Sequence, residues 1–542
     1  IYMFKGVEDM TEVNLISTKK CQITSMISTF EKCSNLYKFR IEGFGADKLK
    51  SMSKLFYRTR IYFSFFVDFD TKNLEDISYM YANTNIERFS LNGLNTKKVT
   101  NMSHLFQGCP DFVTLNTTGF ETENVKDMSY MFSSCTGIKY IDINSFKTSS
   151  LIDMSHMFQD CISLTNVYIN KLDTSKVEDV SHLFDSCFVM KNVNVSGLVT
   201  SSVKKMSYMF QYCNYLTSIS LTNYDTKNVE TVSGLFASCG SLQEVDLTGF
   251  NLGNAKDMSN MFYDCYSLRK VTFGKNINTI NVETMSGLLD ECMLLNTVDI
   301  ENLRTNNVKD MSKMFQDCTK LESIDISNFV TSKVQNMSRM FTGCTGVNHL
   351  DLRNFETGQV KDMTKMFELM KLSSLDVSRF DTSNVLYMLD LFSEMDNLES
   401  IDVSHFNTGN AKDLAGMFFY CGKLRKIDVS GFDTKNVEDF SYMFYGCTAV
   451  TSLEVSGFIT KNANDMSYMF KDCNQLEKLE VSKFDTSQVT DMSYMFAHCT
   501  SLTSLDVTKF KTGNVVNMCS MFTNCRNINS LSMDMFDNTK VT

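Results

Sequence analysis

Apolar and polar positions recur along the chain with a period of about 26 residues. The clearest unit is the run Phe484-Asp-Thr-Ser-Gln-Val-Thr-Asp-Met-Ser-Tyr-Met-Phe-Ala-His-Cys-Thr-Ser-Leu-Thr-Ser-Leu-Asp-Val-Thr-Lys, after which Phe510 begins the next unit. The Phe of each Met-Phe pair is an anchor, and it or an equivalent apolar residue recurs 21 times between Phe4 and Phe522. Successive anchors lie 26 residues apart, with a few spacings of 25 and a single 27. Such a period is the signature of a stacked repeat array.

The first half of each unit has helical periodicity. Val489, Met492, Phe496 and Cys499 fall at i, i+3, i+7 and i+10, which predicts one apolar face of a short helix. Asp491 precedes the Met, and most units carry Asp or Asn at this position. An acidic residue in the first turn would suit the unpaired N–H groups and the positive dipole end of such a helix.

The second half of each unit alternates with period two and predicts a short strand. In the last complete unit the inward positions of this strand are Leu502, Leu505 and Val507. One unit cannot bury its apolar face alone, whereas stacked units with parallel strands can. We therefore expect an α/β solenoid, a leucine-rich-repeat-like array of about 21 rungs, each with a short parallel strand and a short helix. A helix-free β-solenoid is the alternative.

The repeat covers the chain without a linker, so we expect one continuous array over residues 1–542. The chain begins and ends within a repeat, which suggests a segment of a longer protein. Three rungs are irregular, near residues 57–70, 274–281 and 386–395. Unique features of these rungs could be used by a ligand.

Composition and charge exclude several classes of function. The net charge of −11 argues against binding to nucleic acid, and no apolar run of about 18 residues could span a membrane. The chain contains no phosphate-binding loop, nucleophile elbow or zinc-protease motif. A repeat also supplies the same residues everywhere, whereas catalysis needs different residues in one place. We expect no enzymatic activity and no cofactor.

Two ladders of small residues accompany the core pattern. Sixteen of the 18 Cys lie three residues after an anchor, and Met370 and Met395 replace Cys at two of these positions. Buried thiols explain this column better than zinc binding, although disulfides between adjacent rungs are geometrically conceivable. A Thr recurs in the turn before the helical half; we interpret it as a hydroxyl that satisfies backbone groups rather than an ice-binding array.

The motif Met-Phe-x-x-Cys-x-x-Leu-x-x-Leu-Asp-Val-Ser-x-Phe-Asp-Thr-x-x-Val-x-Asp-Met-Ser resembles the 26-residue surface-protein repeat of BspA-like and mycoplasma lipoprotein-type proteins. The resemblance covers essentially the whole chain. It implies a leucine-rich type of repeat on a secreted or surface-anchored protein with a role in adhesion and no catalysis. The expected location, at the cell surface or outside the cell, rests on this resemblance.

An outward strand position is acidic in nine successive rungs and is the first candidate binding surface. Like charges on neighbouring strands repel, so this column needs local hydrogen bonds, cations or a basic partner. Local hydrogen bonds within a repeat consensus are the simpler explanation, and no calcium-loop motif is present. The acidic column consists of Asp299, Asp325, Asp351, Asp376, Asp402, Asp428, Glu454, Glu480 and Asp506.

The second candidate surface is an aromatic column on the helical half, at the residue that follows Ser. Its members are Tyr79, His104, Tyr130, His156, His182 and Tyr208, and the pattern returns at Tyr442, Tyr468 and Tyr494. Exposed aromatic residues in succession indicate a recognition surface or lateral packing. Half-buried packing between neighbouring rungs is an equally simple explanation, and two adjacent imidazoles are a weak metal chelate.

These features predict a non-enzymatic surface protein, an adhesin that presents an extended face to a protein or glycan on a host or neighbouring cell. Many weak contacts would sum along the array. The alternative is a structural subunit of an extracellular filament, ring or surface layer that self-associates by solenoid stacking. We expect no nucleic-acid partner and no direct membrane insertion of this segment.

Overall fold

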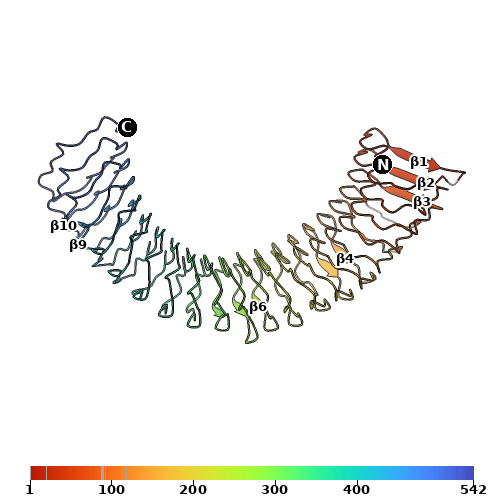
Figure 1. The fold of residues 1–542 in the computed structure, drawn as a ribbon, viewed down its shortest axis with the longest axis horizontal. Coiled ribbons are helices and arrows are strands. Elements are labelled where there is room, and N and C mark those ends of the chain that lie inside the picture. The colour runs from red at the N-terminus through yellow and green to blue at the C-terminus, as the bar shows by residue number, and fades with distance from the viewer. Residues whose placement is uncertain (1, 20, 87–90, 92, 118) are drawn as a thin grey trace. The chain divides into compact units, whose positions relative to one another are not determined.

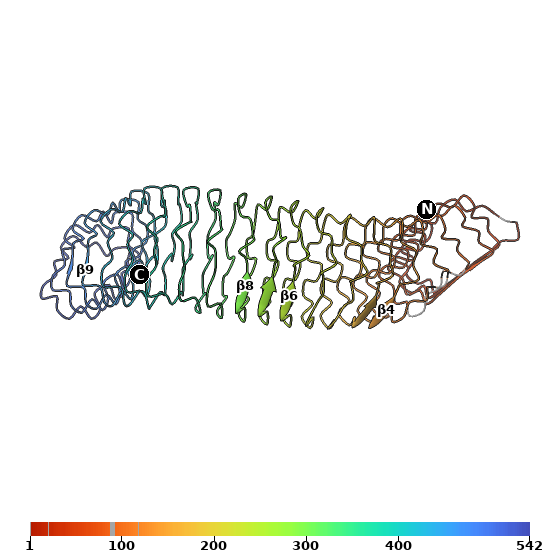
Figure 2. The same cartoon turned by 90° about the horizontal axis from the view of Figure 1, so that it is seen from below.

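The computed structural model describes residues 2–19, 21–86, 91, 93–117 and 119–542. It contains two compact units, Ile1–Thr279 (unit 1) and Ile280–Thr542 (unit 2). Within each unit the chain winds as a solenoid whose successive turns are stacked (Figures 1 and 2). The boundary between the units falls in the irregular rung at 274–281.

The strands confirm the parallel stacking that the repeat predicts. In unit 1, β1 pairs with β2 and β2 with β3, β4 pairs with β5, and β6 pairs with β7, all in parallel with partners 25 or 26 residues apart. In unit 2, β9 pairs with β10 in the same way. The strands are β1 Glu12–Ile16, β2 Lys38–Glu42, β3 Phe63–Val67, β4 Tyr140–Asp142, β5 Asn166–Tyr168, β6 Glu244–Asp246, β7 Lys270–Thr272, β8 Thr297–Asp299, β9 Ser452–Leu453 and β10 Lys478–Leu479.

The predicted helices are wrong: the residues that the structure describes form no helix. In the turn that follows Asp491, the N–H groups of Met492, Tyr494 and Phe496 donate to carbonyls of the next rung at 2.9–3.0 Å. The N–H groups between them donate within the turn, as from Met495 to Met492. Because every second N–H group donates to a carbonyl of the next rung, these groups cannot donate to the carbonyl four residues earlier, as a helix requires. The helix-free solenoid is the better description.

Left-handed residues shape these turns. Tyr494 and His498 have φ of 55° and 64°, a region that interrupts a right-handed helix. The Asp that precedes the Met also has a different role from the one predicted. Oδ1 of Asp491 accepts the backbone N–H of Ser493 at 2.7 Å, so this Asp closes a turn instead of beginning a helix.

The inward positions are nevertheless those that the periodicity indicates. Val489, Met492, Phe496 and Cys499 are all fully buried. The anchor rings form continuous stacks through each unit, with 5.6–5.7 Å between the centroids of successive rings from Phe106 to Phe262. Dispersion and the burial of these rings therefore hold neighbouring rungs together.

The Cys and Thr columns are structural parts of the core. The cysteines of the described chain form no disulfide, and the thiol of Cys135 donates to the carbonyl of Phe106 in the preceding rung at 3.0 Å, a contact that other members of the column repeat. The Thr174 hydroxyl accepts the N–H of Val199 at 2.7 Å and donates to its carbonyl at 2.9 Å. The hydroxyls of Thr226 and Thr486 likewise satisfy backbone groups of the next rung, whereas that of Thr148 has no partner among the described residues.

In two irregular rungs, another residue takes the place of the Cys and the fold is kept. At 57–70, the hydroxyl of Thr59 donates to the carbonyl of Phe56 at 2.9 Å, where other rungs have a thiol. Strand β3 in this rung exposes Phe63 and Phe65. At 386–395, Met395 is fully buried at the Cys position.

Candidate binding surfaces

The acidic column lies on the outward face of the strand region, as the alternation predicts. Asp376 is exposed, whereas its neighbours Leu375 and Val377 are buried. The same exposed residue between two buried ones occurs at Asp506, and Asp402 is exposed between the half-buried Ile401 and the buried Val403. Unit 2 therefore presents a row of carboxylates, one from each rung, from Asp325 to Asp506.

Local hydrogen bonds hold one oxygen of each carboxylate. Oδ1 of Asp325 accepts the N–H of Ser327 at 3.1 Å and its hydroxyl at 2.7 Å. The residue two positions later donates its N–H in the same way to Asp351, Asp376, Asp402, Asp428, Glu454, Glu480 and Asp506. The simpler explanation of the column, as a turn consensus, is therefore correct for one oxygen of each carboxylate.

The other oxygen remains available. Among the described residues, Oδ2 of Asp325, Asp376 and Asp402 has neither a hydrogen bond nor an ion pair. Hydrogen bonds from the following Ser hydroxyl and amide lower the pKa of these three carboxyls. The column is consequently anionic at neutral pH and directs its second oxygens toward solvent.

Three members of the column differ. Oδ2 of Asp428 lies 3.8 Å from Nζ of Lys426. Asp351 forms a bidentate ion pair with Arg353, with Nη2 to Oδ2 at 2.6 Å and Nε to Oδ1 at 2.9 Å, and this guanidinium holds the pKa of Asp351 far below its usual range. Asp299, at the end of β8, is half-buried, and its Oδ1 is enclosed without a hydrogen-bond partner among the residues described. The strip of accessible charge therefore begins after Asp299.

The aromatic column forms a continuous stack in unit 1. Neighbouring rings from Tyr79 to Tyr208 lie 4.0–4.9 Å apart between centroids, with interplanar angles of 6–23°. The prediction that these side chains are exposed is only partly correct. They are half-buried because each inner ring is covered on both faces by its neighbours. Only the ring edges are available to a partner.

Backbone geometry orients this stack. The six residues from Tyr79 to Tyr208 all have φ between 55° and 57°. The same repeat position is Gly at Gly234 and Gly416, whose φ is 60°. A left-handed backbone costs a residue with a side chain about 1 kcal/mol or more, which ring stacking of about 0.5–1.5 kcal/mol per pair offsets.

The three imidazoles of the stack have defined partners. Nδ1 of His104 and of His156 lies 2.9 Å from Oε1 of Gln107 and Gln159, respectively, and Nδ1 of His182 lies 2.9 Å from Oδ2 of Asp185. Within the described chain, no group of three or more His, Cys, Asp or Glu side chains is arranged to hold a metal ion.

The stack should make unit 1 sensitive to acid. Burial lowers the pKa of His104 and His156 below 6.5, the value expected in the unfolded chain. Between pH 7 and pH 5 the unfolded state therefore binds protons first, and the folded state loses stability. We expect the thermal midpoint to fall over this range, and to fall less in a His104→Tyr, His156→Tyr variant, which keeps aromatic rings in the column. Identical pH profiles for the two proteins would refute this role.

In unit 2 the sequence pattern identified only part of an aromatic cluster. Tyr442, Tyr468 and Tyr494 stack at 4.6 and 4.8 Å. The Nζ of Lys471 lies 4.7 Å from the ring centroid of Tyr445 and 5.3 Å from those of Tyr468 and Tyr494. Lys471 and Tyr445 follow anchors directly, three residues after the aromatic column, and this spacing was the signal that could have revealed them.

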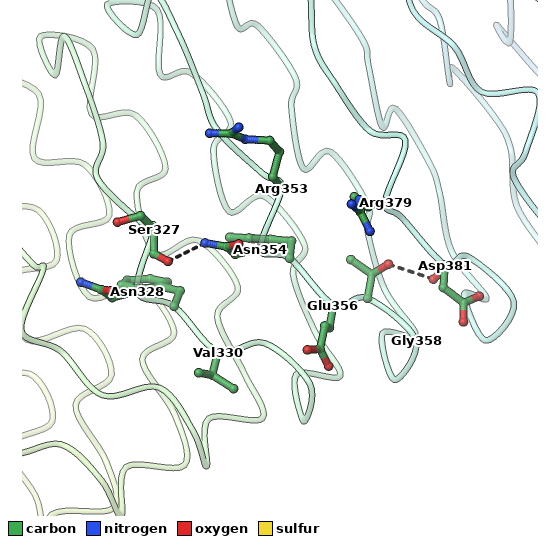
Figure 3. Close-up of a pocket in the computed structure, with 12 residues that line it drawn as sticks. Ser327, Asn328, Val330, Arg353, Asn354, Glu356, Gly358, Arg379 and Asp381 are labelled. Atoms are coloured by element: carbon green, nitrogen blue, oxygen red, sulfur yellow. Dashed lines mark hydrogen bonds between the residues drawn. The ribbon is translucent and has the colours of Figure 1, made fainter.

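The pattern also missed a groove on unit 2. It has a volume of about 750 Å³ and spans three rungs, with lining residues from 327–330, 353–358, Arg379 and Asp381 (Figure 3). Its signal in the sequence is the pair Arg353 and Arg379, which follow the acidic column by two and three residues.

Comparison with known proteins identifies the repeat. The profile described as "Mycoplasma protein of unknown function, DUF285" matches six times, at residues 1–92, 83–194, 184–274, 271–374, 369–479 and 448–542. A search of curated proteins gives no match. The described chain has no helix with the length and hydropathy needed to cross a membrane.

Solved structures of leucine-rich repeat proteins are also similar. One from Bacteroides ovatus is 18% identical with a TM-score of 0.34, and the alignment covers 69% of this chain and 81% of that one. One from Eubacterium ventriosum is 14% identical with a TM-score of 0.37, and the alignment covers 65% and 87% of the two chains.

Proposed function

The chain belongs to the Mycoplasma repeat family DUF285, and we propose that it is a non-enzymatic surface protein that binds a basic protein partner on a neighbouring or host cell. Adhesion at the cell surface is the biological role that we propose for this binding. The observation that carries the proposal is the strip of outward carboxylates in unit 2, in which the second oxygens of Asp325, Asp376 and Asp402 have no partner among the described residues.

The mechanism is a summation of weak contacts. Each exposed ion pair contributes only about 0.2–1 kcal/mol, but parallel rungs place one carboxylate about every 4.8 Å along the stack. Successive Lys or Arg side chains of one partner can therefore bind at several rungs at once, and the later contacts are effectively intramolecular. Because the charges are exposed, binding should weaken as salt is added.

The aromatic stack of unit 1 is our second proposed contact surface. Its ring faces are covered, so a partner would meet only ring edges, which carry the Tyr hydroxyls and the outer imidazole nitrogens. This arrangement supports polar edge contacts rather than stacking of a flat ligand on the rings.

A triple variant tests the acidic strip. We expect Asp376→Asn, Asp402→Asn and Asp428→Asn together to weaken binding of a labelled (Lys-Ser)8 peptide by about tenfold at low salt, on the basis of three exposed ion pairs. Asn keeps the oxygen that accepts the turn N–H, as Asn101 does for Ser103 elsewhere in the chain. Fluorescence anisotropy at several salt concentrations gives both the affinity and the salt slope.

The matched control removes the same number of charges from a different column. Asp433, Asp485 and Asp537 accept the N–H of the residue two positions later in the same way, but they lie at another repeat position, directly after the Phe that follows the strand region, where Asp433 and Asp485 precede the buried Thr434 and Thr486. Their triple Asn variant should bind the peptide nearly as well as the wild type. An equal loss of affinity in both variants would mean that net charge alone attracts the peptide, and would reject the strip as a binding face.

A further inference from the structure

A uniform strip of carboxylates binds a basic segment but does not determine its register. From Asp376 to Asp506 successive rungs offer nearly the same side chain in the same turn. A partner that carries only cations could therefore shift by one rung without loss. Specific recognition needs at least one rung that rejects a cation and accepts something else.

The groove on unit 2 is such an interruption. Two Arg side chains line it (Figure 3), Arg353 and Arg379, which follow Asp351 and Asp376 of the acidic column by two and three residues. Asn354 also lines the groove, and its Nδ2 donates to the carbonyl of Ser327 at 2.7 Å. The guanidinium groups of Arg353 and Arg379 are the cationic side chains among the described residues that line the groove.

The two guanidinium groups are in different states. Arg353 is engaged by Asp351 through two short hydrogen bonds. Arg379 is exposed and has no hydrogen bond or ion pair with any residue that the structure describes. A carboxylate is the natural ligand of a guanidinium, because the planar donor fork matches its two oxygens.

Anionic side chains surround this cation. Glu356 and Asp381 line the same groove, are exposed and make no ion pair within the described chain. Asp376 and Asp402, on the strip, also have a free oxygen. The charge pattern presented to a partner is therefore one cation among several anions.

We propose that this groove sets the register of the partner by binding, through Arg379, one acidic side chain that lies within a basic segment of the partner protein. The inference rests on the proposed function, because the flanking cations of that segment bind the acidic strip. A cation placed at the groove is repelled by Arg379, whereas an acid there gains a bidentate contact. The partner thus has a lowest-energy position along an otherwise repetitive face.

A double-mutant cycle tests the contact. The probes are two labelled peptides, Lys-Ser-Lys-Ser-Glu-Ser-Lys-Ser-Lys-Ser and the same peptide with Gln in place of Glu. Each is titrated against the whole chain as wild type, as Arg379→Gln and as Lys483→Gln at one salt concentration. Lys483 lies three residues after Glu480, as Arg379 does after Asp376, but outside the groove. It is therefore the matched control for loss of one positive charge.

The quantity compared is the ratio of the affinity for the Glu peptide to the affinity for the Gln peptide. We expect this ratio to be about fivefold larger for the wild type than for the Arg379→Gln variant. The Lys483→Gln variant should keep the wild-type ratio. Equal ratios in all three proteins would overturn the register site while peptide binding itself leaves the proposed function in place. The same reduction of the ratio in both variants would also overturn the register site, because any nearby cation would then favour the Glu peptide equally. If neither peptide binds the wild type, the proposed function fails, and the register site fails with it.

Discussion

Replacing Thr174 with Val is expected to lower the free energy of unfolding by about 2 kcal/mol, although Val has nearly the same shape as Thr. The loss has a specific cause. The hydroxyl of Thr174 accepts the N–H of Val199 and donates to its carbonyl, and Thr174 itself is only 2% exposed. Without the hydroxyl, two enclosed backbone groups lose their partner, and each unsatisfied group costs about 1–3 kcal/mol.

The chain contains a matched control one rung earlier. Thr148 occupies the same column and is also 2% exposed, but its hydroxyl has no hydrogen-bond partner in the part of the chain that the structure describes. Thr148→Val should therefore be neutral or slightly stabilising. Hydrogen exchange gives a local measurement, because the Val199 amide should lose protection in the Thr174 variant only. Equal destabilisation by the two substitutions would show that the hydroxyl ladder contributes nothing beyond packing.

The contrast between these two threonines illustrates what the sequence could predict. The 26-residue period identified the Thr column and its role in the turn, because identical positions in a stacked array meet identical surroundings. It could not distinguish Thr148 from Thr174. Whether a hydroxyl finds its partner depends on tenths of an ångström in the backbone of the next rung, and no residue pattern encodes that.

The helix that we predicted for the first half of each unit was wrong for a related reason. The spacing of Val489, Met492, Phe496 and Cys499 correctly predicted which side chains face inward, but inward spacing does not determine the backbone path. A turn with left-handed residues at Tyr494 and His498 places the same side chains inside. Glycines at 234 and 416, in the same column, were the available signal, since a left-handed backbone favours Gly.

For the binding surfaces, alternation correctly predicted that the acidic column faces outward, because one residue between two buried ones must do so. Alternation alone could not predict the groove. It depends on the hydrogen bond from Asn354 to the carbonyl of Ser327 and on Arg379 having no partner within the described chain while Asp351 engages Arg353. These are differences in side-chain orientation between rungs with similar sequences, which a consensus averages away.

Replacing Phe158 with Ala should have the largest effect on stability, a loss of about 3–5 kcal/mol. The ring is fully buried and stacks on Phe132 at 5.7 Å and on Phe184 at 5.6 Å. Its removal leaves a cavity and breaks the ring stack in the middle of unit 1. Because each rung of a solenoid is stabilised mainly by its two neighbours, the lost contacts cannot be recovered from elsewhere.

The break in the ring stack should also reduce the cooperativity with which unit 1 unfolds. If stacking between adjacent anchors couples the rungs, the parts of unit 1 on either side of residue 158 should unfold separately in Phe158→Ala, and the urea m-value should fall. Phe158→Leu is the control, because Leu289 is fully buried at the same repeat position in unit 2. It should cost only roughly 1–2 kcal/mol, in proportion to its smaller cavity, and keep the wild-type m-value. A wild-type m-value in the Ala variant would show that the strand and turn hydrogen bonds couple the rungs without the ring stack.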